Sequence, residues 1–181
     1  AGLVVDRDAL IDAIWGPTPP AGARHALQVH VSALRRMLGG RPTVLESRSS
    51  GYVLRLVAGQ LDSERFEELA SAGRAELASG RPAKAAELFD SALCLWRGAA
   101  LADVAWERFA SGEVARLEEA RRWVEENRVD AELAAGNCEH AVVLSRALIE
   151  AEPFREQRWC QAMLALYRCG RQAEALDLYS R

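Results

Sequence analysis

Apolar residues recur at helical spacing between residues 22 and 38. Four of them stand at positions i, i+4, i+7 and i+11 and so form one stripe of a helix: Leu27, Val31, Leu34 and Leu38. Small, polar and basic residues fall on the opposite side: His25, Val29, Ser32, Ala33 and Arg36. The pattern therefore predicts an amphipathic helix over about 22–38, with its apolar stripe against a core.

The segments on either side of this helix carry clear boundary signals. Asp6 is placed to cap a short helix that runs to Trp15, and Gly16 followed by prolines ends it. After a turn at residues 39–42, alternation over 43–47 and 52–56 predicts two strands around a tight turn. Residues 1–58 thus read as helix, turn, helix and hairpin.

From Leu61 onward the pattern changes to long helices. Gly136 and Gly170 lie 34 residues apart, which is the period of a tetratricopeptide (TPR) repeat. Aligned on these glycines, the repeat places Ala141 and Ala175 at packed positions between helices. Gly80 fits the same template, with Gly73, Ala85, Phe89 and Ala92 as further packing residues and extra residues around 99–121. Residues 62–181 are therefore expected to form an all-α, TPR-like domain.

Charge is distributed unevenly along the chain. The 181 residues carry a net charge of −3, but the first 61 hold seven arginines against four carboxylates, so +3 lies there and −6 in the remainder. Between Arg24 and Arg55 the single acidic residue is Glu46. A basic patch on an acidic chain is typical of a small DNA-binding module joined to something else. With no apolar run near the ~20 residues of a membrane span and no signal-peptide pattern, we expect a cytoplasmic protein.

Motifs for chemistry are missing from the sequence. The four cysteines have neither C-x-x-C spacing nor a histidine at ligand spacing, so we expect no metal site and no disulfide. No phosphate-binding loop or nucleophile motif occurs, and we expect neither an enzyme nor a cofactor. The Glu-Glu pairs at 67–68, 118–119 and 125–126 read as charged faces. We expect His140 to be solvated. Four tryptophans are expected to pack between helices: Trp96, Trp106, Trp123 and Trp159. The alternative is that an exposed subset of them forms a groove for a peptide.

Several motifs together resemble a known family. They are LIDAIWG at residues 10–16, the proline-rich entry at 19–24, VHVSALRRMLG at 29–39 and SGYVL at 50–54. These resemble the OmpR/PhoB-type winged helix of SARP-type transcriptional activators of actinobacteria, and residues 95–103, 116–121 and 164–176 resemble the bacterial transcriptional activation domain that follows it. The resemblance implies a mainly α fold: a partial winged helix-turn-helix at 1–58, without the family's N-terminal strands and first helix, then the TPR-like domain.

The resemblance assigns roles on DNA to particular residues. Val29 and Ser32 are placed nearest the bases, and Gln28 is placed to read adenine. Phosphate contacts are expected from Arg24, His25, His30, Arg35 and Arg36. Arg48 is expected at the tip of the wing (residues 43–56), and Tyr52 in the core of the wing with its hydroxyl toward a phosphate. An exposed valine and a solvated glutamine are the alternatives at Val29 and Gln28.

Two functions follow from these observations. The first is a transcriptional regulator that binds double-stranded DNA and, by resemblance, contacts RNA polymerase through its helical domain, with a homodimer left open. The second is an interaction scaffold, or the regulatory module of a larger ATPase-containing regulator, without DNA binding of its own. Ala33 favours the second because the family usually has arginine there. The arginine cluster between Arg24 and Arg55 favours the first.

Overall fold

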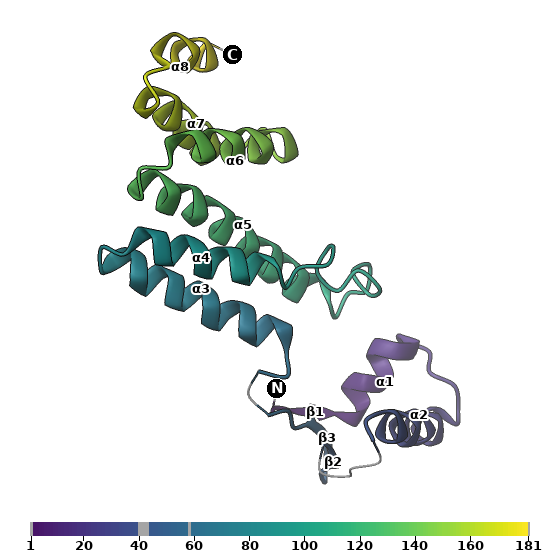
Figure 1. Ribbon diagram of the computed structural model, residues 1–181. Helices are drawn as coiled ribbons and strands as arrows, with labels where there is room; N and C mark the ends of the chain where they lie inside the picture. The colour runs from purple at the N-terminus through teal and green to yellow at the C-terminus, as the bar shows by residue number, and fades with distance from the viewer. Residues whose placement is uncertain (1, 40–43, 58, 181) are drawn as a thin grey trace. The chain divides into compact units, whose positions relative to one another are not determined.

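The computed structural model describes residues 2–39, 44–57 and 59–180 (Figure 1). Residues 40–42 of the expected turn, Thr43 at the expected start of the wing, and residue 58 at the expected domain end lie outside these ranges. The chain forms two compact units, residues 1–61 and 62–181.

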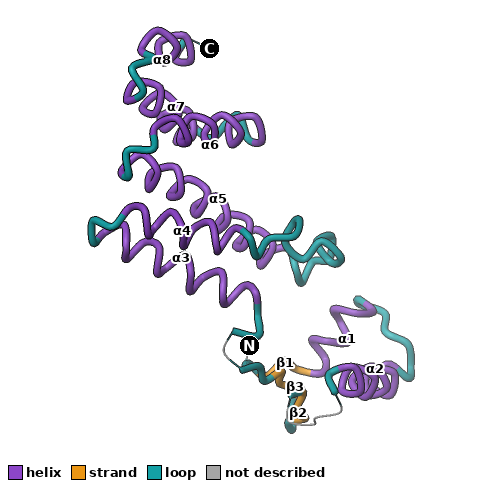
Figure 2. The backbone as a smooth tube through the Cα atoms, in the orientation of Figure 1, coloured by secondary structure: helices purple, strands orange, loops and turns teal. Residues whose placement is uncertain are grey.

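The first unit contains two helices and a small sheet (Figure 2). Its elements are β1 (Val4–Asp6), α1 (Arg7–Trp15), α2 (Ala23–Met37), β2 (Leu45–Ser47) and β3 (Gly51–Leu54). All strands are antiparallel, in the order β1-β3-β2. The helix, helix and hairpin order agrees with the sequence analysis, whereas β1 was missed. Its three residues are all exposed, so no alternation marks them, and their pairing partner lies far along the chain.

Local chemistry explains the boundaries of these elements. The Asp6 carboxylate accepts a hydrogen bond from the backbone N–H of Asp8 at 2.8 Å and so caps α1 as expected. Gly16, at φ 68°, ends α1 by donating its N–H to the Asp12 carbonyl. At Gly51 an added Cβ would lie 1.9 Å from the carbonyl oxygen of Val5, so only glycine lets β1 pair with β3 here.

The core of this unit involves the first half of α2. Its buried cluster comprises Ile11, Ala23, Leu27, Val31, Leu45 and Tyr52. The predicted apolar stripe is confirmed at Leu27 and Val31 but is wrong at Leu34 and Leu38, which are 48% and 42% exposed. The buried stripe starts one turn earlier, at Ala23, because α1 and the hairpin cover that part of the helix.

Over its described residues 62–180, the regular secondary structure of the second unit is helical. Its helices are α3 (Asp62–Ala78), α4 (Pro82–Leu93), α5 (Ser111–Ala134), α6 (Cys138–Ala151), α7 (Glu156–Arg168) and α8 (Gln172–Tyr179). Successive helices pack on one another along the unit (Figure 1). Gly80, Gly136 and Gly170 lie in the turns before α4, α6 and α8, each with positive φ. The predicted TPR-like repeat is therefore confirmed.

Small residues let these helices approach closely. An added Cβ at Gly73 would lie 2.6 Å from the ring of Phe89, so α3 and α4 depend on glycine at this crossing. Ala85 and Ala141 are completely buried, as the repeat template predicted. Ala175 is only partly buried, and none of the residues of α8 is fully buried.

Two expectations about the helical unit are corrected. The extra residues between repeats were placed around 99–121, but α5 already begins at Ser111, so the irregular segment is residues 94–110. Trp106 lies in this segment and is 75% exposed, so its predicted packing role is wrong. Trp96 and Trp123 do pack on the core as expected. The segment contains no helix against which Trp106 could be buried.

The charged residues of α5 have partners that the sequence did not indicate. Glu125 and Glu126 were read as a charged face, and in the structure Glu126 is 8% exposed and pairs with Arg155 at 2.7 Å. Arg158 of α7 is 1% exposed and lies 3.0 Å from Glu125. These arginines lie about thirty residues further along the chain, so helical spacing within α5 does not reveal them.

His140 also has a partner that the sequence did not indicate. It was expected to be solvated, whereas its side chain is half-exposed and its Nδ1 lies 3.0 Å from the buried carboxylate of Glu132.

Over the described ranges, no helix combines the length and apolarity that crossing a membrane requires.

Candidate nucleic-acid interface

The outer face of α2 is polar, basic and open to solvent. It holds six exposed residues assigned to DNA from the sequence: Arg24, His25, Gln28, Val29, Ser32 and Arg36. The buried residues Ala23, Leu27 and Val31 anchor the other face of the same helix. The structure thus brings these six candidates together on one surface of a 15-residue helix. The seventh, His30, is exposed at the edge of the anchored face, with its ring centroid 6.3 Å from that of Trp15. A helix of this kind fits a DNA major groove.

Two side chains in the middle of this surface have distinct properties. The Ser32 hydroxyl donates to the carbonyl oxygen of Gln28 at 2.8 Å, which leaves the hydroxyl oxygen free to accept a hydrogen bond. Val29 is an apolar side chain that is 53% exposed on this otherwise polar surface. A thymine methyl group is one apolar surface that would cover it.

Arg35 connects the helix to the hairpin. Its Nε donates to the carbonyl oxygen of Leu45 at 2.8 Å, and its Nη2 donates to the hydroxyl of Ser47 at 2.9 Å. The side chain is therefore partly buried and bound within the unit, whereas the sequence analysis assigned it to a phosphate. These bonds fix β2 relative to α2.

The wing carries two arginines on either side of one carboxylate. Nε of Arg55 lies 3.1 Å from Oε1 of Glu46, and Nη2 of Arg48 binds Oε2 of the same group. Glu46 is the acid that the charge pattern singled out, but its partners became visible only in the structure. Arg24 has a similar partner, because its Nη2 lies 2.9 Å from Oδ1 of Asp8 with both side chains 72% exposed.

The side chains of Tyr52 and Arg7 are in contact. Tyr52 is 7% exposed, so its ring belongs to the core as expected, and the contact proposed for its hydroxyl stays a prediction. The guanidinium carbon of Arg7 lies 5.4 Å from the centre of this ring. The sequence analysis missed Arg7 because its partners lie more than forty residues away.

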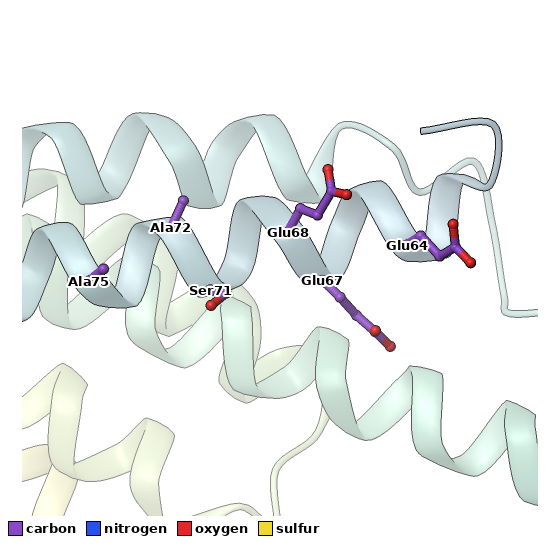
Figure 3. A pocket seen from close by; sticks show the side chains of 6 residues that line it. All are labelled: Glu64, Glu67, Glu68, Ser71, Ala72 and Ala75. Carbon is purple, nitrogen blue, oxygen red and sulfur yellow. The ribbon is translucent and has the colours of Figure 1, made fainter. Parts of the chain in front are cut away.

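The helical unit presents a different surface. A shallow pocket on α3 is lined by Glu64, Glu67, Glu68, Ser71, Ala72 and Ala75, with Glu67 and Glu68 leaving the helix in different directions (Figure 3). Glu67 binds Arg116 of α5, and Glu68 lies 3.4 Å from Arg65. An acidic lining repels phosphate, so this pocket is no part of a DNA surface. Among the described residues, no group of three or more His, Cys, Asp or Glu side chains is arranged to hold a metal.

The fold and the exposed α2 surface define a winged helix-turn-helix joined to a TPR-like helical unit. The family model "Transcriptional regulatory protein, C terminal" matches residues 1–54, and the model "Bacterial transcriptional activator domain" matches residues 61–181. The chain therefore belongs to the SARP family of transcriptional regulators, which combine an OmpR/PhoB-type winged helix with this activator domain.

Named regulators of Streptomyces are similar to nearly the whole chain. Regulatory protein AfsR of Streptomyces coelicolor is 43% identical, over 99% of this chain and 18% of AfsR. Transcriptional regulator RedD of the same organism is 37% identical, over 99% of this chain and 53% of RedD. Regulatory protein DnrI of Streptomyces peucetius is 38% identical, over 99% of this chain and 69% of DnrI. The chain thus spans from about a fifth to two thirds of the length of these relatives.

A solved structure has the same fold. Mycobacterium tuberculosis EmbR, in complex with a low affinity phosphopeptide, superposes with a TM-score of 0.93 at 34% sequence identity. The match covers 99% of this chain and 48% of the EmbR chain. EmbR is itself a transcriptional regulatory protein by name.

Proposed function

We propose that this chain binds double-stranded DNA through its winged helix and activates transcription through its helical unit. In this proposal α2 enters the major groove, with Val29, Ser32 and Gln28 nearest the bases. Phosphates are contacted by Arg24, His25, His30 and Arg36, and by Arg48 from the wing. The proposal needs no catalytic step and places the protein with the chromosome in the cytoplasm.

The arrangement of α2 is the observation that supports DNA binding most directly. Six polar, basic or otherwise unexplained residues face solvent together, while the opposite face of the helix is held in the core. Arg35 has a different role in this proposal: its bonds to β2 set the distance between the recognition helix and the wing. Its contribution to DNA binding is therefore indirect.

The helical unit is proposed to act on other proteins. Its acidic α3 surface is unsuited to DNA, and residues 94–110 expose the aromatic side chains of Trp106 and Phe109, which are 75% and 60% exposed. Exposed aromatic residues are common in protein interfaces. Together with membership of an activator family, this supports contact with RNA polymerase and dimerisation as functions of residues 62–181.

Fluorescence anisotropy on a labelled, mixed-sequence duplex tests the proposal. Binding should weaken steeply as salt rises, by about 0.9 log units of affinity per log unit of salt for each phosphate contact. The double variant Arg36→Ala with Arg48→Ala should weaken binding to every sequence and reduce this slope by about 2. Arg97→Ala, which removes one positive charge where the double variant removes two, is the control at an 85%-exposed site on the helical unit.

The outcomes separate the two functions considered. Salt-sensitive binding that is lost in the double variant but not in Arg97→Ala supports a DNA-binding regulator. Absence of salt-sensitive binding by the intact chain would refute DNA binding and favour the interaction scaffold.

A further inference from the structure

Arg7 binds the tip of the wing through three consecutive carbonyl groups. Its Nη1 donates to the carbonyl oxygen of Ser49 at 2.5 Å, and its Nη2 donates to that of Arg48 at 2.8 Å. The backbone N–H of Arg7 donates to the carbonyl oxygen of Ser50 at 3.0 Å. A single residue at the start of α1 therefore holds the whole turn between β2 and β3.

Arg7 is itself held in place from two sides. Its guanidinium group lies over the ring of Tyr52, which is buried in the core of the unit. The preceding residue, Asp6, both caps α1 and pairs with Gly51 in the sheet. Because its backbone and its side chain are both fixed, Arg7 can hold the turn in one position.

The turn needs such support because it has little of its own. Across its ends, Arg48 donates its backbone N–H to the carbonyl of Gly51 at 2.8 Å. Strands β2 and β3 have only three and four residues, so few ladder hydrogen bonds adjoin the turn. The side chain of Arg48 is half-exposed, so packing does not hold it either.

We propose that Arg7 is a positioning residue for DNA binding, which fixes the wing tip so that Arg48 meets the DNA backbone. This inference rests on the proposed function. Arg7 acts through its hydrogen bonds to carbonyl groups, and its charge does not contact DNA. Two properties follow: its effect on DNA affinity depends on Arg48, and lysine cannot replace it, because an ammonium group lacks the planar, forked donors of a guanidinium.

A double-mutant cycle on the full 181-residue chain tests this inference. Affinity for the mixed-sequence duplex is measured at several salt concentrations for Arg7→Gln, Arg48→Ala and the double variant. We expect Arg7→Gln to lower affinity about tenfold, the worth of a hydrogen bond to a charged group, and to lower the salt slope by about 0.9. With Arg48 already replaced by alanine, Arg7→Gln should add less than about twofold.

Arg7→Lys is the decisive second variant, because it keeps the positive charge. If Arg7 is a positioning residue, lysine at this position should not restore the DNA affinity that Arg7→Gln loses. Amide hydrogen exchange at Arg48 should be faster in both Arg7→Gln and Arg7→Lys, while the α2 amides stay protected. Protected α2 amides also show that the unit is still folded. Full rescue by lysine, or additive losses with Arg48→Ala, would overturn the inference and make Arg7 a direct phosphate contact. Failure of the unmodified chain to bind DNA would instead contradict the proposed function.

Discussion

Two arginines of the proposed DNA surface, Arg24 and Arg48, have carboxylate partners before any DNA is present. Glu46 lies between Arg48 and Arg55 on the wing, and Asp8 pairs with Arg24. Exposed ion pairs contribute little to stability, about 0–1 kcal/mol each. Phosphate groups can therefore replace these carboxylates at low cost, but each carboxylate still repels the approaching backbone. If the wing contacts DNA as proposed, Glu46 is expected to limit its affinity.

Replacing Glu46 with glutamine should strengthen DNA binding. Removing one negative charge next to two arginines should raise affinity about threefold to fivefold at low salt, which corresponds to an exposed ion pair of ~1 kcal/mol. The gain should shrink as salt screens the charges. Anisotropy titrations of Glu46→Gln measure this, with Glu68→Gln on α3 as the control, since Glu68 is also a glutamate paired with an arginine. Unchanged or weaker binding by Glu46→Gln would contradict this view of the wing.

At the scale of single residues, the sequence predicted exposure better than partners. Most exposed positions of α2 were predicted because side chains on a helix repeat every 3.6 residues; Val29 was correctly placed outside the core, whereas Leu34 was not. The bonds of Arg35 to Leu45 and Ser47 were not predicted. Which partner a long, flexible guanidinium reaches depends on an element ten or more residues away.

At the scale of elements, ion pairs contribute to the stability of α8. It has no buried residue, and Glu174 in its first turn accepts hydrogen bonds from Arg171 and Arg146. These two guanidinium groups, Arg171 foremost, lower the pKa of Glu174 to about 2 from its ordinary value of 4.5. A lowered carboxylate pKa stabilises the folded form above pH 4.5, and this stabilisation is lost as the pH falls from 4.5 toward 2.

The helix α8 should therefore loosen in acid below pH 4.5. An NMR titration should find the midpoint of the Glu174 carboxyl near 2, with the α8 amide signals shifting over the same range. In Glu174→Gln the acid-dependent change in α8 should disappear, and α8 should be looser already at neutral pH. A Glu174 midpoint close to 4.5 would show that its ion pairs are not formed in solution.

Element boundaries were the part of the fold most readily derived from the sequence. Caps and glycines set them locally: Asp6 starts α1, and Gly136 and Gly170 form the turns before α6 and α8. Strand β1 was missed because a three-residue strand exists only through its partner β3. The end of the irregular segment was misplaced because residues 111–121 are charged and carry little apolar periodicity.

The whole molecule consists of two compact units of unequal size. Among the described residues, the smaller unit, residues 1–61, has one buried cluster of six residues, whereas the larger has two, of eight and six residues. A unit of about 60 residues buries a smaller fraction of its surface on folding and is correspondingly marginal in stability. The winged helix should therefore be the less stable unit.

Calorimetry on the full chain should resolve two unfolding transitions. The lower one belongs to residues 1–61 and should shift upward when duplex is added, because a ligand stabilises the unit to which it binds. The upper one, from the helical unit, should stay in place and should be reproduced by residues 62–181 alone. A single transition, or equal shifts of both on adding duplex, would contradict independent unfolding of the units.

The sequence by itself determined the helices, the glycine turns, the hairpin and the polar face of α2, because these follow from local periodicity and backbone preference. The tertiary structure alone decided how charged groups are paired. Arg7 with the wing turn, Glu46 between its arginines, and Glu126 with Arg155 are such cases. The periodicity of apolar residues in the sequence indicates which side of a helix or strand is buried. An ion pair or hydrogen bond depends instead on which distant element packs against that helix or strand.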